Sequence, residues 1–390
     1  MKSGGNVYRF LIFYFVAYGG AHLYFHVKLK RALHPSRKWN LIISIYLLII
    51  FLSPVIARNL ESSGLDRIQE LLSSAGYLWM GLLFLFVTAA AFIDTINCIV
   101  SFVRSLAKKA KRTIISPKAL FLASAVYATL IGIYGYFEAR DIRTEHLAIK
   151  SNRIPPGVSR VRIVQLSDVH IGQVVREARI KDILKLVRAA EPDILVSTGD
   201  LVDGHQKHFS GIEKLFLEVR PRLGKFAIMG NHEYYVGIEK SIAFTKESGF
   251  KVLLDENFEL GGLISITGID DSRNREERTA HAAQEKKLLQ AAPGGIFRLL
   301  LKHRPMVEKD SGGKFDLQLS GHTHKGQIFP FNFLTWLSFP VKTGLTRLKE
   351  GGWLYVSRGT GVWGPPIRFL APPEITIIDL IPESAINTKN

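Results

Sequence analysis

The chain has 390 residues, of which 47% are hydrophobic and 22% are charged, with 51 Lys and Arg against 34 Asp and Glu. This composition excludes a disordered or fibrous chain, and the single cysteine, Cys98, excludes a disulfide-stapled fold and a cysteine-rich zinc site. The net charge of +17 is uneven, because residues 1–150 hold 18 basic and 7 acidic side chains whereas residues 151–390 hold 33 and 27. The two parts are therefore expected to be different kinds of protein.

The first part contains four long apolar stretches, which predict a four-helix transmembrane region over residues 1–140. The predicted spans are residues 10–27, 39–57, 71–97 and 119–137. Each stretch approaches or exceeds the roughly 20 helical residues that a bilayer core requires. A signal peptide fits the first stretch less well, because the apolar run is long and no small-x-small cleavage site follows it.

The connections between the predicted spans differ in charge. The first and third connections carry eleven basic residues and no acidic one: Lys28, Lys30, Arg31, Arg37, Lys38, Arg104, Lys108, Lys109, Lys111, Arg112 and Lys118. The second has Arg58 and Arg67, offset by three acidic residues. The positive-inside rule puts the basic connections in the cytoplasm. The sequence thus predicts a multi-pass protein of the cytoplasmic membrane whose C-terminal part lies outside the cytoplasm.

The pattern changes after residue 140. Residues 141–158 contain a Pro-Pro pair and are predicted to be a linker, and residues 159–390 a folded domain. Apolar runs predict strands over residues 161–166, 194–197, 225–229, 263–267, 298–301, 315–319, 354–357 and 374–380, and amphipathic periodicity predicts helices over 177–190 and 238–248. This order predicts a mixed α/β or α+β domain whose sheets are covered by helices.

Polar motifs follow five of the predicted strands. In chain order they are Asp168-Val169-His170, Gly199-Asp200, Gly230-Asn231-His232-Glu233, His303 and Gly321-His322-Thr323-His324. The first three motifs recur about every 30 residues, the length of a strand-helix-strand unit, so their side chains are expected to return to one edge of a sheet. Each motif alone is common as a turn or a surface pair. All five in order, each after an apolar strand, indicate a metal site built from carboxylate, imidazole and amide groups.

These motifs, in this order, resemble those of the calcineurin-like metallophosphoesterases, and the resemblance extends from Ile163 to Leu380. The tail, which contains Ser357-Arg358-Gly359-Thr360-Gly361, Pro366-x-Arg368 and Pro373-Glu374, resembles the membrane-associated bacterial branch of that family. The resemblance implies a four-layer α-β-β-α sandwich of two packed sheets.

The resemblance also implies a site for two divalent metal ions. Asp168, His170 and His324 would bind the first ion, and Asn231, His303 and His322 the second, with Asp200 bridging both. Such thiolate-free ligands suit Mn, Fe or Zn. A hydroxide shared by two ions would then attack the phosphorus of a phosphate ester.

Further roles follow from the same resemblance. His232 would stabilise the phosphoryl charge or protonate the leaving oxygen, and Glu233 could orient that imidazole. Related sequences usually have glycine where this chain has Lys325. Lys325 is therefore a candidate ligand of the substrate phosphate, as are Arg304 and Arg368.

The segment Phe329–Leu348, which follows the paired histidines, is unusually apolar for a loop. It is either a core-packing insertion or a cap that enters the bilayer surface.

The sequence thus predicts a membrane-anchored, metal-dependent hydrolase of phosphate esters, acting in lipid metabolism on a lipid-linked phosphate mono- or diester. Its expected partners are membrane lipid and this substrate, and not nucleic acid. Two alternatives stay open. One is a UDP-diacylglucosamine-type pyrophosphohydrolase, which would need a cytoplasmic domain, and the other is a non-catalytic metal-binding scaffold. The sequence does not fix the oligomeric state.

Overall fold

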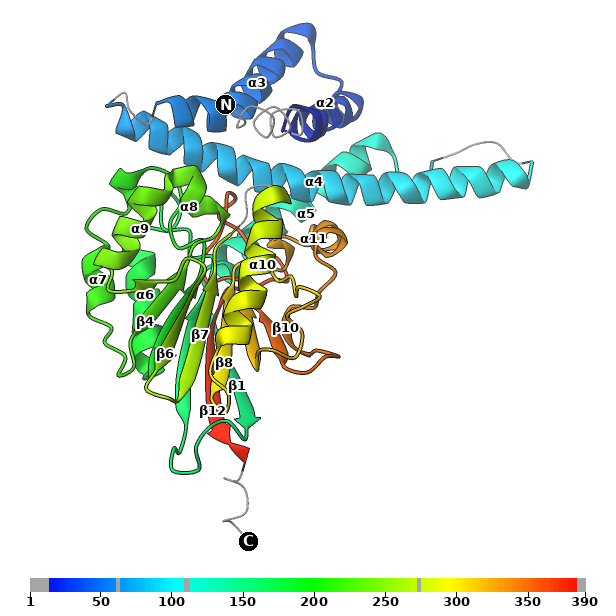
Figure 1. Ribbon diagram of the computed structural model, residues 1–390. Helices are drawn as coiled ribbons and strands as arrows, with labels where there is room; N and C mark the ends of the chain where they lie inside the picture. The colour runs from blue at the N-terminus through cyan, green and yellow to red at the C-terminus, as the bar shows by residue number, and fades with distance from the viewer. Residues whose placement is uncertain (1–13, 61–63, 109–112, 272–274, 384–390) are drawn as a thin grey trace. The chain divides into compact units, whose positions relative to one another are not determined.

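The computed structural model describes residues 14–60, 64–108, 113–271 and 275–383 (Figure 1). The chain divides into two compact units, residues 1–137 with 364–367 and residues 138–363 with 368–390. The first is helical and the second holds all the strands of the described residues.

The first unit consists of long apolar helices. Its elements are the π-helix η1 (Tyr14–Tyr18), α2 (Gly19–Leu33), α3 (Arg37–Asn59), α4 (Asp66–Leu106) and α5 (Pro117–Glu138). Three of them, α3, α4 and α5, are long and apolar enough to cross a membrane. In the most apolar 18-residue stretch of each helix, only 28%, 28% and 33% is buried within the protein. Large side chains such as Leu48, Phe92 and Leu130 are exposed instead. Apolar surface of this kind on a spanning helix is suited to contact with lipid.

The predicted spans over 39–57, 71–97 and 119–137 correspond to α3, α4 and α5. The first predicted span, 10–27, begins outside the described residues, and its described part forms η1 and the first half of α2. Helix α4 is longer than its predicted span, since its 41 residues extend about 60 Å, roughly twice the thickness of a bilayer core.

Polar side chains connect α2 to α4 within this unit. Asp94 accepts hydrogen bonds from the Tyr24 hydroxyl at 2.6 Å and the Lys28 ammonium at 2.6 Å. The indole of Trp79 donates to Nε2 of His22 at 2.9 Å. An ion pair satisfies a carboxylate that would be costly alone in an apolar environment. Asp94 thus forms a polar contact between α2 and α4.

The second unit is built on two six-stranded sheets. The first sheet has the order β1-β12-β2-β3-β4-β5 and the second the order β10-β11-β9-β8-β7-β6. The strands are β1 (Arg143–Ser151), β2 (Val161–Leu166), β3 (Ile194–Thr198), β4 (Lys225–Ile228), β5 (Lys251–Val252), β6 (Glu256–Leu260), β7 (Ile264–Ile269), β8 (Phe297–Lys302), β9 (Leu317–Ser320), β10 (Gly344–Arg347), β11 (Trp353–Val356) and β12 (Glu374–Pro382).

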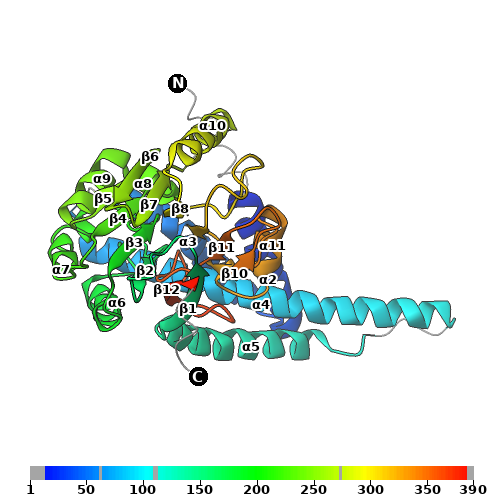
Figure 2. The ribbon, with the colours of Figure 1, turned by 60° about the horizontal axis from the view of Figure 1, so that its bottom comes forward.

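Helices cover the outer faces of both sheets. The helices of this unit are α6 (Glu177–Ala189), α7 (Glu213–Leu217), α8 (Asn231–Val236), α9 (Ile238–Glu247), α10 (Arg275–Ala291) and α11 (Asn332–Ser338), with the 3-10 turns η2 (Gln206–His208) and η3 (His324–Gly326). In Figure 2, α6, α7 and α9 lie outside the first sheet and α10 lies outside the second. The expected four-layer α-β-β-α sandwich is confirmed.

The core follows from the alternation of side chains along the strands. Ile163 of β2 packs between the sheets, together with residues such as Leu299 and Leu317. Its neighbour Val164 packs on the helical side, with Ile183 of α6. Strands that are buried on both faces read as continuous apolar runs. This explains why most of them could be located from the sequence.

The segment predicted to be a linker, 141–158, differs from that expectation. Residues 143–151 form β1, which pairs in parallel with β12 from Arg143–Glu374 to Ser151–Pro382. Because β1 is an edge strand whose side chains are mostly solvent-exposed, it lacks the apolar run that marks the inner strands. The strands β5, β6 and β10 also lie at sheet edges and were not predicted for the same reason. The helices α7, α8, α10 and α11 were not predicted either.

Candidate metal centre

All five polar motifs converge at one end of the sandwich. Strands β2, β3 and β4 are parallel, so the residues that follow them, Asp168, Asp200 and Asn231, emerge at the same edge. Strands β8 and β9 are also parallel and bring His303 and His322 to the corresponding edge of the second sheet. The site lies where the carboxyl ends of both sheets meet, as is usual for open α/β sheets.

One cluster is formed by Asp168, His170 and His324, all of which are buried. Nε2 of His170 lies 3.0 Å from Nε2 of His324, and the latter lies 3.4 Å from a carboxylate oxygen of Asp168. Two imidazole nitrogens that face each other at this distance must share either a proton or a cation. The donor set of two imidazoles and one carboxylate fits a divalent transition metal.

A second cluster is formed by Asp200, His303 and His322. Nε2 of His303 lies 3.1 Å from Oδ2 of Asp200 and 3.1 Å from Nδ1 of His322. The other ring nitrogen of His303 donates to the carbonyl of Thr198 at 2.9 Å. This contact fixes the tautomer that directs Nε2 and its lone pair into the cluster, as the outer contacts of metal-binding histidines do.

Asp200 belongs to both clusters. Besides His303, its Oδ2 lies 3.9 Å from Nε2 of His170, and Asp200, His170 and His232 form a third group of potential ligands. The position of this carboxylate between the two clusters is the one that the bridging ligand of a two-metal site would occupy.

Asn231 supplies an independent test of whether the residues fit a metal. Its side-chain oxygen is buried and has no hydrogen-bond partner. A buried amide oxygen without a partner costs about 1–3 kcal/mol, so its retention requires a reason. Coordination of a cation would satisfy it.

The backbone at the site is strained. Five of the seven predicted ligands have positive φ: Asp168 at 51°, His170 at 53°, Asp200 at 53°, His322 at 68° and His324 at 47°. Non-glycine residues rarely adopt this conformation, and such residues concentrate at functional sites. Glycine is required beside them, because a Cβ at Gly230 would overlap the carboxylate of Asp200 and one at Gly321 would overlap that of Asp168.

His232 lies beside the clusters, with its ring centroid 4.6 Å from that of His170. Its Nδ1 forms a 3.0 Å ion pair with Asp203. Burial opposes the charged form, but Asp200 and Asp203 outweigh this effect and raise the pKa of His232 to about 9. The two carboxylates thus favour the protonated form of the imidazole, which is the form that a general acid needs.

Glu233, which was predicted to orient His232, makes its hydrogen bonds to backbone groups. The Glu233 carboxylate accepts backbone N–H bonds from Gly230 at 2.8 Å, Asp200 at 3.0 Å and Leu201 at 2.6 Å. Glu233 occupies the third position of α8, where a side chain folds back to the helix N-terminus. Glu233 therefore connects the loop after β3 to the loop after β4. The carboxylate that contacts His232 is that of Asp203, which was not predicted.

The structure also changes the interpretation of two predicted phosphate ligands. Arg368 is fully buried, donates to the carbonyls of Arg358 and Ala371 at 2.8 Å each, and lies 3.1 Å from Nδ1 of His324. Arg368 thus supports the ring of His324, a predicted metal ligand, and its guanidinium is engaged by protein groups. Lys325 is exposed and stays a candidate.

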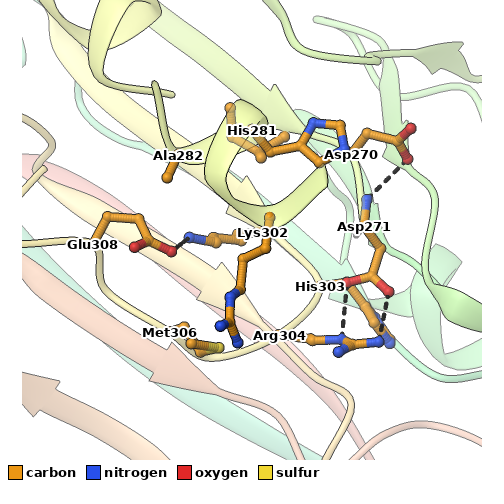
Figure 3. A pocket seen from close by; sticks show the side chains of 11 residues that line it. Asp270, Asp271, His281, Ala282, Lys302, His303, Arg304, Met306 and Glu308 are labelled. Atoms are coloured by element: carbon orange, nitrogen blue, oxygen red, sulfur yellow. Dashed lines mark hydrogen bonds and ion pairs between the residues drawn. The ribbon is translucent and has the colours of Figure 1, made fainter. Parts of the chain in front are cut away.

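Arg304 lines a small polar pocket beside His303 (Figure 3). Its guanidinium forms a bidentate ion pair with the carboxylate of Asp271, and both N–O distances are 3.0 Å. In the same pocket Lys302 is held by Glu285 and Glu308 at 2.8 and 2.9 Å. Arg304 is thus engaged by a carboxylate, and the expectation that it binds substrate phosphate has no support in this arrangement.

Comparisons with known proteins agree with this geometry. The calcineurin-like phosphoesterase family model matches residues 161–326. An uncharacterized metallophosphoesterase of Aquifex aeolicus is 37% identical over 254 residues, which are 65% of this chain and 97% of that protein. One from Campylobacter jejuni is 29% identical over 377 residues, 95% of this chain and 98% of that protein. A transmembrane protein with metallophosphoesterase domain from Danio rerio is 28% identical over 361 residues, 89% and 81% of the two chains. With its sandwich fold and its paired ligand clusters, the chain belongs to the calcineurin-like phosphoesterase family.

Proposed function

We propose that the protein is a membrane-anchored phosphoesterase that uses two divalent metal ions. The observation that carries this proposal is the position of Asp200 between two His/Asp clusters. The buried side-chain oxygen of Asn231, which has no hydrogen-bond partner, supports it. Asp168, His170 and His324 would hold one ion, and Asn231, His303 and His322 the other. The imidazole-rich, thiolate-free donor set suits Mn, Fe or Zn. Two such ions would supply Lewis acidity and lower the pKa of water to about 7.

His232 acts on the substrate in this proposal. Its ring packs between that of His170 and the aromatic rings of Tyr235 and Trp363, at centroid distances of 5.2 and 5.8 Å. Asp203 holds Nδ1, which leaves Nε2 to donate a proton to the leaving oxygen. Lys325, which is exposed, is the cation proposed to meet a phosphate oxygen.

The substrate is proposed to be a lipid-linked phosphate ester in the cytoplasmic membrane, with the catalytic unit outside the cytoplasm. Support for the membrane comes from α3, α4 and α5. The orientation depends on these three helices and their flanking charges, because the basic connections before α3 and between α4 and α5 face the cytoplasm under the positive-inside rule. It does not depend on the first predicted span.

The purified full chain, loaded with Mn, Fe or Zn, is expected to hydrolyse soluble aryl phosphate mono- or diesters, and a chelator should abolish this activity reversibly. Asp200→Asn should lose bound metal and activity together, because it removes the shared carboxylate. Asp182→Asn, which changes an exposed carboxylate of α6, is the matched control. Metal content by mass spectrometry and ester hydrolysis would be measured side by side. An active Asp200→Asn protein with full metal content would contradict the proposed site.

His232→Ala should lower turnover about a hundredfold or more, the usual size of a general-acid effect, while its metal content stays at the wild-type level. The reason is that His232 is assigned to the substrate and not to a metal. Steady-state kinetics and metal analysis of the same sample provide the test. Wild-type turnover in this variant would remove His232 from the mechanism.

Alkaline phosphatase fused to the C-terminus should be active and green fluorescent protein fused there should be dark, because only an extracytoplasmic domain gives this pair of results. The same reporters fused after Lys108 should give the opposite pair. A cytoplasmic C-terminus would overturn the proposed orientation and favour the pyrophosphohydrolase alternative.

A further inference from the structure

Helix α11 exposes its apolar face and partly buries its polar one. Phe333, Leu334, Trp336 and Leu337 are 59%, 53%, 58% and 70% exposed, whereas Asn332 and Thr335 are half-buried. At 100° per residue the four apolar side chains fall within one arc of the helix, and we call them the α11 apolar face. A helix of a soluble protein normally turns such a face toward the core.

Helix α11 is held against the rest of its unit at both ends. At Gly326, which has a φ of 77°, a Cβ would overlap the backbone of Asn332, so the start of α11 lies directly against the turn that carries His324. At the other end of α11 the ring of Phe339 packs edge-on against His322, with centroids 5.0 Å apart. Both ends of the helix thus contact or adjoin candidate metal ligands.

Neighbouring side chains extend this surface. Gln327 exchanges hydrogen bonds of 2.8 and 2.9 Å with the backbone of Trp363, whose indole is 50% exposed. Phe329 and Phe331, 37% and 38% exposed, continue the apolar surface toward α11. The exposed cations Lys325 and Lys342 lie on either side of this segment in the chain.

The composition of this surface indicates its partner. Aromatic and leucine side chains with flanking lysines are typical of helices that lie in a membrane interface, where rings enter the acyl boundary and cations meet anionic head groups. A bilayer is the expected surrounding of this chain, because α3, α4 and α5 are long and apolar enough to cross one.

We propose that the α11 apolar face inserts into the interface of the bilayer that anchors the chain and holds the metal centre at the level of the lipid head groups. The inference deepens the proposed function and rests on it for its catalytic meaning, because the site would then meet phosphates that are attached to lipid. The insertion itself does not require activity and can be tested without it.

The test uses the full chain in vesicles of phosphatidylcholine and phosphatidylglycerol. Cys98 is changed to Ser, and a nitroxide is attached to Leu337→Cys. The matched control is Leu217→Cys, which replaces a 45% exposed leucine on α7, at the opposite side of this unit (Figures 1 and 2). We expect the Leu337 label to be accessible to lipid-soluble oxygen and about tenfold less accessible than the Leu217 label to a water-soluble nickel complex, as for a group below the head groups.

A second variant shows whether the apolar face causes the insertion. Adding Phe333→Ser and Trp336→Ser should return the Leu337 label to the accessibility of the Leu217 label. Equal nickel accessibility at Leu337 and Leu217 in the otherwise unchanged chain would overturn the proposal. A Leu337 label shielded from both oxygen and nickel would also overturn it, and dipolar coupling between two labels would then identify a second copy of the chain as the partner. If the Leu337 label lies at the expected depth in the bilayer but the metal-loaded chain does not hydrolyse aryl phosphate esters, the result would count against the proposed function alone.

Discussion

The buried carboxylate of Asp200 is the group on which the site depends. It lies with Asp168 and Glu233 in a region where all three side chains are at most 2% exposed, and such charges are costly unless they are compensated. Burial raises the pKa of Asp168 to about 6 and that of Glu233 to about 7, and the charge of Asp200 adds to both shifts. His232, whose pKa the charges of Asp200 and Glu233 raise, and the N–H groups at the start of α8 offset only part of this charge. Divalent cations would offset the rest, and they would also account for the strained backbone and for the side-chain oxygen of Asn231.

Much of this arrangement could be predicted from the sequence, because the ligands follow buried strands. The apolar runs of β2, β3, β8 and β9 locate the strand ends, and parallel pairing brings those ends together. What could not be predicted is the direction of side chains that leave a loop or the first turn of a helix. Glu233 turns back to backbone amides, whereas Asp203, three residues after Asp200, reaches His232. A carboxylate that close to a predicted ligand was the available signal, but sequence spacing alone does not say which of two carboxylates meets the imidazole.

The direction of the side chain also limited the predictions for the two arginines. Arg304 and Arg368 stand in motifs beside the ligands, and a guanidinium near a phosphate site invites a role in binding substrate. In the structure Asp271 engages the first, while backbone carbonyls and His324 surround the second. The edge strand β1 was missed for a different reason, since its exposed, polar side chains give no apolar run. In the helical unit the orientation stays a prediction, and it depends on α3, α4 and α5 and not on the first predicted span.

The central claim is that water, activated in a centre formed by both sheets, attacks phosphorus without a covalent intermediate on the protein. Hydrolysis in ¹⁷O-labelled water of an aryl thiophosphate monoester made chiral at phosphorus with ¹⁶O and ¹⁸O tests it most directly, with the metal-loaded chain as the catalyst. The account predicts inversion of configuration at phosphorus, because water displaces the aryl alcohol in one step. Retention of configuration would contradict it, because retention requires two displacements and a covalent intermediate on the protein.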